Sequence, residues 1–203
     1  MHTQPLIVAA THTEIAPSIP TLDKHHIPYL ITGVGMVATT YSLTRTLVKA
    51  SFPYILNVGI AGSFVKDMEV GSLIEVRRDT FSELGAEDHD DFRSIEELGF
   101  GISSWENIPV DGVETGLRQA QSISVNAVHG NVNSITQLLQ RHPDVHAESM
   151  EGAAVFYVCT AENIPCLQVR AISNYVEARD KNMWNIPLAV QNLNSWLLGF
   201  LGL

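Results

Sequence analysis

Two glutamates stand where they could take part in chemistry. Glu151 lies in Glu148-Ser-Met-Glu-Gly-Ala-Ala154, at the expected start of a helix. A helix N-terminus favours an anion, so a structural carboxylate is one interpretation, with Ser149 as the helix cap. The small and apolar neighbours indicate close packing instead, and a carboxylate packed there would hold ligand hydroxyls. Glu14, in Ala-Ala-Thr-His-Thr-Glu14, is by itself only an acidic residue in a loop.

Polar and glycine-rich segments follow two other expected strands. Ser173 and Asn174 come directly after a strand, where an Asx turn is the alternative to a ligand contact. Gly59-Ile-Ala61-Gly62-Ser63 also follows a strand. It is typical of a loop whose backbone approaches a ligand, and equally of a structural turn.

A third glycine-rich segment, Gly33-Val-Gly35-Met-Val-Ala38, imitates a dinucleotide-binding fingerprint. The acidic ribose ligand expected about 20 residues further on is missing, so tight packing between a strand and a helix is the favoured interpretation. The eight histidines show no metal-ligand spacing, and Cys159 and Cys166 form no Cys-x-x-Cys pair. The sequence therefore implies no cofactor and no metal.

The elements that must position these residues alternate between strands and helices. Hydrophobic patterns predict strands at 5–10, 29–32, 54–58, 72–77, 122–128 and 166–172, and helices at 37–49, 132–140, 149–163 and 187–201. This alternation indicates an α/β domain with a central sheet, formed by residues 1–203 as a single domain. Ligands of such sheets gather at the carboxyl ends of strands. Residues 82–118 are polar, rich in glycine and not assigned.

Composition narrows the class of protein further. The chain has 203 residues with 45% hydrophobic residues, enough for one sizeable core, and some of that apolar surface could be buried between subunits. A net charge of −10 and the lack of any Lys/Arg run argue against nucleic acid as a partner. There is no signal-peptide pattern and no apolar stretch of membrane-spanning length, so we expect no membrane association and a cytoplasmic location.

Taken together and in this order, the segments resemble the nucleoside phosphorylase/nucleosidase family over nearly the whole chain. The matching pieces are Ala-Ala-Thr-His-Thr-Glu14, Thr32-Gly-Val-Gly-Met-Val-Ala38, Asn57-Val-Gly-Ile-Ala-Gly-Ser63, Glu148-Ser-Met-Glu-Gly-Ala-Ala154 and Arg170-Ala-Ile-Ser-Asn174. Within that family the chain looks most like the futalosine hydrolase branch. That likeness rests on Phe81-Ser-Glu-Leu-Gly-Ala-Glu-Asp88, Val125-Asn-Ala-Val-His-Gly130, Ser173-Asn-Tyr-Val-Glu177 and Trp184-Asn-Ile-Pro187.

The resemblance implies a three-layer α/β/α sandwich around a mixed sheet, a homodimer or larger homo-oligomer, and a purine nucleoside as substrate. It implies that Glu14 activates the attacking water and that Glu151 holds the ribose hydroxyls beside Met150. Val128 and His129 would flank the base. Ala61, Gly62 and Ser173 complete the expected binding site.

Asn174 departs from the adenine-specific members, which have Asp at the matching position. An amide can donate to purine N7 or to a 6-oxo group, so Asn174 fits hypoxanthine better than adenine. The expected activity is hydrolysis of futalosine to release hypoxanthine. A methylthioadenosine or S-adenosylhomocysteine nucleosidase and a non-catalytic purine-binding protein are the alternatives. The partner of the substrate carboxylate is left open among Arg45, Arg77, Arg78, Arg93 and Lys66.

Overall fold

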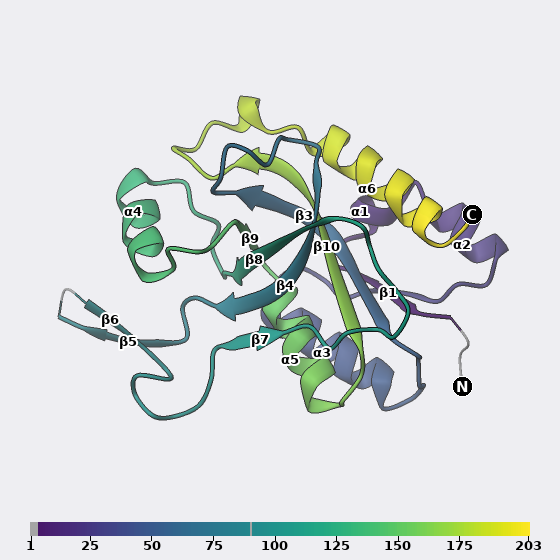
Figure 1. Ribbon diagram of the computed structural model, residues 1–203, viewed down its shortest axis with the longest axis horizontal. Coiled ribbons are helices and arrows are strands. Elements are labelled where there is room, and N and C mark those ends of the chain that lie inside the picture. The colour runs from purple at the N-terminus through teal and green to yellow at the C-terminus, as the bar shows by residue number, and fades with distance from the viewer. Residues whose placement is uncertain (1–3, 90) are drawn as a thin grey trace.

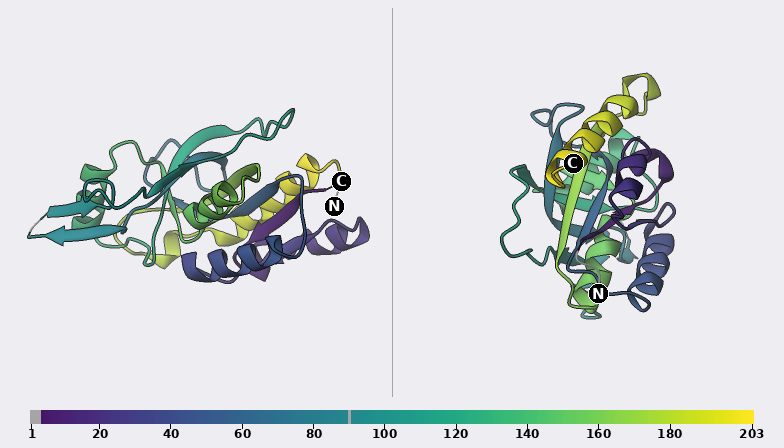
Figure 2. Two further views of the ribbon diagram at one scale, coloured as in Figure 1. Left: turned by 90° about the horizontal axis from the view of Figure 1, so that it is seen from below. Right: turned by 90° about the vertical axis from the view of Figure 1, so that its right-hand side faces the viewer.

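The computed structural model describes residues 4–89 and 91–203. A central β-sheet is covered by helices on both faces (Figures 1 and 2). The strands are β1 (Leu6–Ala9), β2 (Tyr29–Ile31), β3 (Ile55–Ser63), β4 (Leu73–Phe81), β5 (Gly85–Asp88), β6 (Asp91–Ser94), β7 (Ser104–Glu106), β8 (Arg118–Ser124), β9 (Ala147–Ser149) and β10 (Cys166–Tyr175). The helices are α1 (His12–Ile15), α2 (Ile19–Lys24), α3 (Met36–Leu47), α4 (Val132–Arg141), α5 (Gly152–Ala161), the 3₁₀ turn η1 (Lys181–Met183) and α6 (Ile186–Phe200).

The sheet is mixed, as the sequence predicts, and part of it closes on itself. β3 pairs in parallel with β1 and with β10, and the other edge of β10 pairs antiparallel with β4. β4 pairs in parallel with β8, which leads through β9 back to β3. β3, β10, β4, β8 and β9 therefore form a closed ring, which brings the carboxyl ends of β3 and β10 close to β9.

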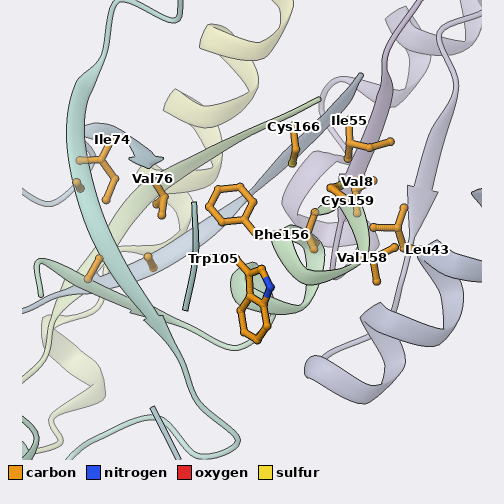
Figure 3. Close-up of a cluster of buried hydrophobic side chains, with 14 of the residues drawn as sticks. Val8, Leu43, Ile55, Ile74, Val76, Trp105, Phe156, Val158, Cys159 and Cys166 are labelled. Carbon is orange, nitrogen blue, oxygen red and sulfur yellow. The ribbon is translucent and has the colours of Figure 1, made fainter. Parts of the chain in front are cut away.

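Two apolar layers sandwich the sheet. On one face, α3 and α5 pack Leu43, Phe156 and Val158 against strand residues (Figure 3). On the other face, α1, α2 and α6 contribute Ile15, Leu22, Leu193 and Leu197. Successive strand residues pack alternately into one layer and the other, since neighbouring side chains of a strand point to opposite faces. This arrangement confirms the predicted α/β fold with helices on both sides.

Two predictions of local structure were wrong. The segment Gly59–Ser63 is not a loop, because β3 continues through it with β10 on one side and β9 on the other. The helix expected at 149–163 begins only at Gly152, since Ser149 belongs to β9 and pairs with Ser124 of β8. Ser149 is therefore not the helix cap, although its Oγ accepts a 3.4 Å hydrogen bond from the Gly152 N–H.

Other boundaries moved as well. β8 lies at Arg118–Ser124, earlier than the strand expected at 122–128. The unassigned stretch 82–118 contains β7 at the sheet edge and a β5–β6 hairpin that projects away from the body (Figure 1). Among the described residues, no helix is long and apolar enough to cross a bilayer. The outer face of α3 exposes Val37 and Tyr41, and the expected homo-oligomer stays a prediction.

Candidate active site

A cavity of about 330 Å³ opens at the carboxyl ends of β1, β3 and β10. This is the edge at which ligands of α/β sheets bind, and the volume lies at the lower end of the range for small-molecule sites. All nine residues predicted from the sequence line it: Glu14, Ala61, Gly62, Val128, His129, Met150, Glu151, Ser173 and Asn174. The fold therefore brings together segments that are up to 160 residues apart.

Glu14 is buried at one side of this cavity and is held by several donors. Its Oε2 accepts hydrogen bonds from the Thr11 backbone N–H at 2.8 Å and from the Thr11 hydroxyl at 3.0 Å. Its Oε1 accepts from the Ile60 N–H at 3.1 Å. Glu14 thus closes a capping box at α1 as well as facing the cavity, a structural role that the sequence interpretation did not include.

Glu151 lies beside Met150, at the N-cap of α5. Its Oε1 accepts a 2.9 Å hydrogen bond from the backbone N–H of Gly35. Gly35 has φ of +92°, a conformation that L side chains rarely adopt, so a glycine is favoured where this N–H must face the carboxylate. Burial raises the pKa of Glu151, the Gly35 hydrogen bond and Arg170 oppose the rise, and the nearby Glu14 charge adds to it.

Arg170 lies beneath these carboxylates and is a residue to which the sequence interpretation gave no role. It is 2% exposed, and its Nη1 donates a 3.4 Å hydrogen bond to Asn57 Oδ1. Its Nε and Nη2 are buried without a hydrogen-bond partner among the described residues. The Arg170 guanidinium lies against Gly59, next to the Glu14 carboxylate, and it also acts electrostatically on Glu151.

Ser173 and Asn174 are both brought to the cavity by an irregularity in β10. The register against β3 shifts between Ile172 and Asn174, so that Asn174 lies opposite Gly62. Such a bulge redirects side chains, and here two consecutive residues line the same cavity. The Ser173 hydroxyl donates to Asn174 Oδ1 at 2.8 Å, and Asn174 Nδ2 donates to the Tyr175 carbonyl at 3.0 Å. One N–H of the Asn174 amide therefore remains available for a ligand.

A close contact between the side chains of His129 and Glu148 fixes the cavity wall that also contains Asn174. His129 Nδ1 lies 2.7 Å from Glu148 Oε2, and the His129 backbone N–H donates to Glu148 Oε1 at 2.9 Å. Glu148 also lines the cavity, although the sequence analysis gave it no role. Glu83 steadies the same segment, since its Oε2 accepts from the Asn126 backbone and amide at 3.1 and 2.8 Å. Val128 and His129 are thus held rigidly at the cavity wall.

The cavity wall contains one arginine or lysine, Arg179, and Trp184 lies beside it. None of the five cations considered for a substrate carboxylate lines the cavity: Arg45, Arg77, Arg78, Arg93 and Lys66. Three of these five form ion pairs elsewhere, with Glu75, Asp88 and Glu177. Within residues 4–89 and 91–203, no cluster of three or more His, Cys, Asp or Glu side chains forms a candidate metal site.

The chain is similar in sequence to proteins of one known superfamily. The family model of the phosphorylase superfamily matches residues 117–202. The chain is 33% identical to the futalosine hydrolase of Streptomyces coelicolor over 91% of its own length and 83% of that protein. The chain belongs to the phosphorylase superfamily.

Other members of the superfamily show the same likeness at greater distance. A 5′-methylthioadenosine/S-adenosylhomocysteine nucleosidase of Haemophilus influenzae is 23% identical over 97% of the chain and 91% of that protein. The native structure of the futalosine hydrolase of Helicobacter pylori superposes with a TM-score of 0.81 at 19% identity, covering 98% of this chain and 97% of that one. At this identity the superposition shows that the fold is the superfamily fold.

For this superfamily member, Gly59→Ala is expected to impair the site more than the fold. A Cβ at Gly59 would lie 2.8 Å from both Arg170 Nη1 and Glu14 Oε1, so both charged groups must move. Misplacement of reacting groups by about 1 Å costs on the order of 10²-fold in rate. Steady-state turnover and thermal unfolding measure the two effects. Gly199→Ala, where a Cβ meets nothing within 4 Å, is the control, and an unchanged rate in Gly59→Ala would contradict this packing.

Proposed function

We propose that this chain hydrolyses the N-glycosidic bond of a purine nucleoside, with futalosine as the preferred substrate and hypoxanthine as the released base. The observation that carries the proposal is that two carboxylates, those of Glu14 and Glu151, line one cavity together with the amide of Asn174. A sugar that becomes cationic fits between the carboxylates, and the base fits against the amide.

The carboxylate of Glu151 is complementary to the charge that develops in the transition state of glycoside cleavage. As the bond to the base breaks, positive charge develops on the sugar and negative charge on the base. Glu151 would accept hydrogen bonds from the ribose hydroxyls, and these bonds strengthen as the sugar becomes positive. Because Arg170 opposes the rise in its pKa, Glu151 is held closer to the ionised form that this role requires.

Glu14 would take the proton from the attacking water. Its carboxylate is oriented by Thr11 and Ile60 before any ligand binds, which removes the need to reorganise in the reaction. A base that is fixed in this way holds water at a defined position next to the sugar. Glu14 and Glu151 thus divide the work between proton transfer and stabilisation of the cation.

Water rather than phosphate is the proposed nucleophile. The sequence has no arginine between Lys49 and Lys66, but the fold brings Arg170 Nη1 directly against Gly59. Arg170 is buried, however, and does not line the cavity, whereas Glu14 and Glu151 do. A phosphate dianion would meet two carboxylates and no free cation at that point, so like-charge repulsion disfavours its binding.

The base assignment rests on Asn174. The Ser173 hydroxyl orients Asn174 Oδ1, which leaves an N–H to donate to purine N7 or to a 6-oxo group. The similarity to the Streptomyces coelicolor futalosine hydrolase supports the same choice. Methylthioadenosine or S-adenosylhomocysteine is the second candidate substrate, because a nucleosidase named for these compounds matches 97% of the chain at 23% identity.

Asn174→Asp is therefore expected to lower the rate on 6-oxopurine nucleosides at least about tenfold, an effect of about 1.4 kcal/mol. The ionised carboxylate would face the 6-oxo oxygen with like charge, and it can no longer donate. Adenine nucleosides should lose less or gain. The measurement is kcat/KM on a nucleoside of each class. An equal loss on both classes would show that this side chain does not read the base.

The type of reaction is tested by chromatography of the products formed from futalosine with and without inorganic phosphate. Hydrolysis predicts hypoxanthine and the free sugar product at the same rate in both samples. A rate that requires phosphate, with a sugar 1-phosphate as product, would contradict the proposed role of water. If no purine nucleoside is cleaved but purines bind, the alternative of a non-catalytic purine-binding protein replaces the proposal.

A further inference from the structure

The side of the cavity that holds Asn174 also contains a positive charge that no step so far uses. Arg179 lines the cavity together with His129, Asn174 and Trp184. The same four residues also line a small extension of about 10 Å³ next to it. Met150 and Glu151, assigned to the ribose, line the main cavity but not this extension. Arg179 therefore shares the side of the cavity assigned to the base.

The backbone and the stem of Arg179 are held in place. Its backbone N–H donates to the Gly130 carbonyl at 3.1 Å, and its Cβ lies 3.0 Å from the position that a Gly130 Cβ would take. The segment that follows is tied to β10, since the Asn185 N–H donates to the Ser173 carbonyl at 2.8 Å. The close approach of Arg179 to the residue after His129 thus depends on a glycine there.

The head of Arg179 is presented to a ligand. Its Cζ lies 5.3 Å from the centre of the Trp184 ring, and the side chain is solvent-exposed. No carboxylate of the described residues lies within ion-pair distance of it, although the chain has a net charge of −10. A guanidinium is weakly hydrated and presents a planar fork of donors, so it loses little when a flat acceptor replaces water.

We propose that Arg179 is a specificity-determining residue that binds the 6-oxo edge of the purine and stabilises the negative charge of the departing base. This inference rests on the proposed function. A 6-oxopurine that leaves as an anion spreads charge onto its exocyclic oxygen, which is an acceptor for the guanidinium. Adenine presents an amino group at that position, which would face Arg179 donor to donor.

The other anion to consider is the carboxylate of futalosine, which is remote from the base. Arg179 lines the small extension together with Asn174 and His129, whereas Met150 and Glu151 do not, so the base edge is the assigned partner. The two assignments differ in a measurable way. Hypoxanthine carries no carboxylate, so its binding depends on Arg179 only if Arg179 contacts the base.

The test compares Arg179→Met, which keeps an apolar stem over Gly130, with Arg179→Lys, which keeps the charge without the fork. Arg141→Met is the matched control, because Arg141 also packs on an aromatic ring, that of Phe92, at 4.5 Å but lies outside the cavity. Calorimetry measures the binding of hypoxanthine and of adenine. Turnover is measured with futalosine and with methylthioadenosine, and thermal unfolding monitors the fold.

The inference predicts that Arg179→Met weakens hypoxanthine binding at least about tenfold and lowers kcat/KM for futalosine about 10²-fold, in the range for a charge-stabilising donor. Adenine binding should stay unchanged or improve, and Arg179→Lys should recover part of the loss. Unchanged hypoxanthine binding with a loss confined to futalosine would overturn the inference in favour of the substrate carboxylate. Equal losses for both bases would also overturn it.

The two proposals fail in different ways. A wild-type chain that binds hypoxanthine but releases no base from any nucleoside overturns the proposed hydrolysis, while the dependence of that binding on Arg179 still decides this inference. A wild-type chain that cleaves futalosine and is unaffected by Arg179→Met overturns the inference and leaves hydrolysis standing. A wild-type chain with no affinity for hypoxanthine overturns the base assignment of Arg179.

Discussion

Replacing Glu14 by Gln is expected to lower kcat by on the order of 10²–10⁴, the usual contribution of a general base, while KM changes little. The amide keeps the shape of the side chain and one acceptor oxygen, so the Thr11 cap can persist while the Ile60 N–H loses its acceptor. What is lost is the ability to take a proton from water. Single-turnover and steady-state rates on futalosine, with separate binding of hypoxanthine, measure the two effects.

The capping role of Glu14 requires a control for stability. Glu162→Gln is the matched control, since Glu162 is an exposed glutamate at the C-cap of α5, outside the cavity. Both variants should unfold within a few degrees of the wild type. Wild-type turnover in Glu14→Gln would remove Glu14 from the mechanism. A loss of turnover that tracks a large drop in Tm would assign Glu14 to the fold instead.

Replacing Glu151 by Gln is expected to lower kcat by about 10²–10³, the range for removing one electrostatic contact to the transition state. Gln retains an oxygen for the Gly35 N–H, so the start of α3 should keep its position. The negative charge that faces the cationic sugar is lost. Ground-state binding of nucleoside should weaken less than kcat falls, and a loss confined to KM would contradict the proposed role.

The same variant should change the pH dependence of activity. Because burial raises the pKa of Glu151, the wild type should lose activity on acidification at a higher pH than an ordinary glutamate would give. The ionised form is the active one, so activity rises with pH through this pKa and is lost below it. In Glu151→Gln, the fall of the remaining activity on acidification should occur at a lower pH than in the wild type. A fall at the same pH would show that Glu151 does not control it.

The alternation of strands and helices could be predicted because buried strands such as Leu6–Ala9 are continuous apolar runs. Elements that depend on partners distant in sequence could not. β9 has only three residues and is a strand because β8 and β3 lie on either side of it. The hairpin β5–β6 consists of exposed and half-buried residues, so it has no apolar period to reveal it.

The candidate site was easier to predict than its surroundings. Glu14 and Glu151 come shortly after β1 and β9, and Asn174, expected after a strand, lies near the carboxyl end of β10. The carboxyl ends of neighbouring parallel strands must meet at one edge. The part of Arg170 was not predicted, because the sequence of a strand does not show which carboxylates a buried arginine will lie next to. Arg179 was missed for a different reason, since an exposed arginine in a loop looks like ordinary surface until Gly130 and Trp184 are placed beside it.

The central claim is that this cavity selects a 6-oxopurine nucleoside for cleavage by water. The most direct measurement places futalosine and methylthioadenosine together, at equal concentration in phosphate-free buffer, and follows the released bases by chromatography. The ratio of initial rates equals the ratio of kcat/KM values. The account predicts that hypoxanthine is released at least about tenfold faster than adenine, a difference of about 1.4 kcal/mol between transition states. Faster release of adenine would contradict it.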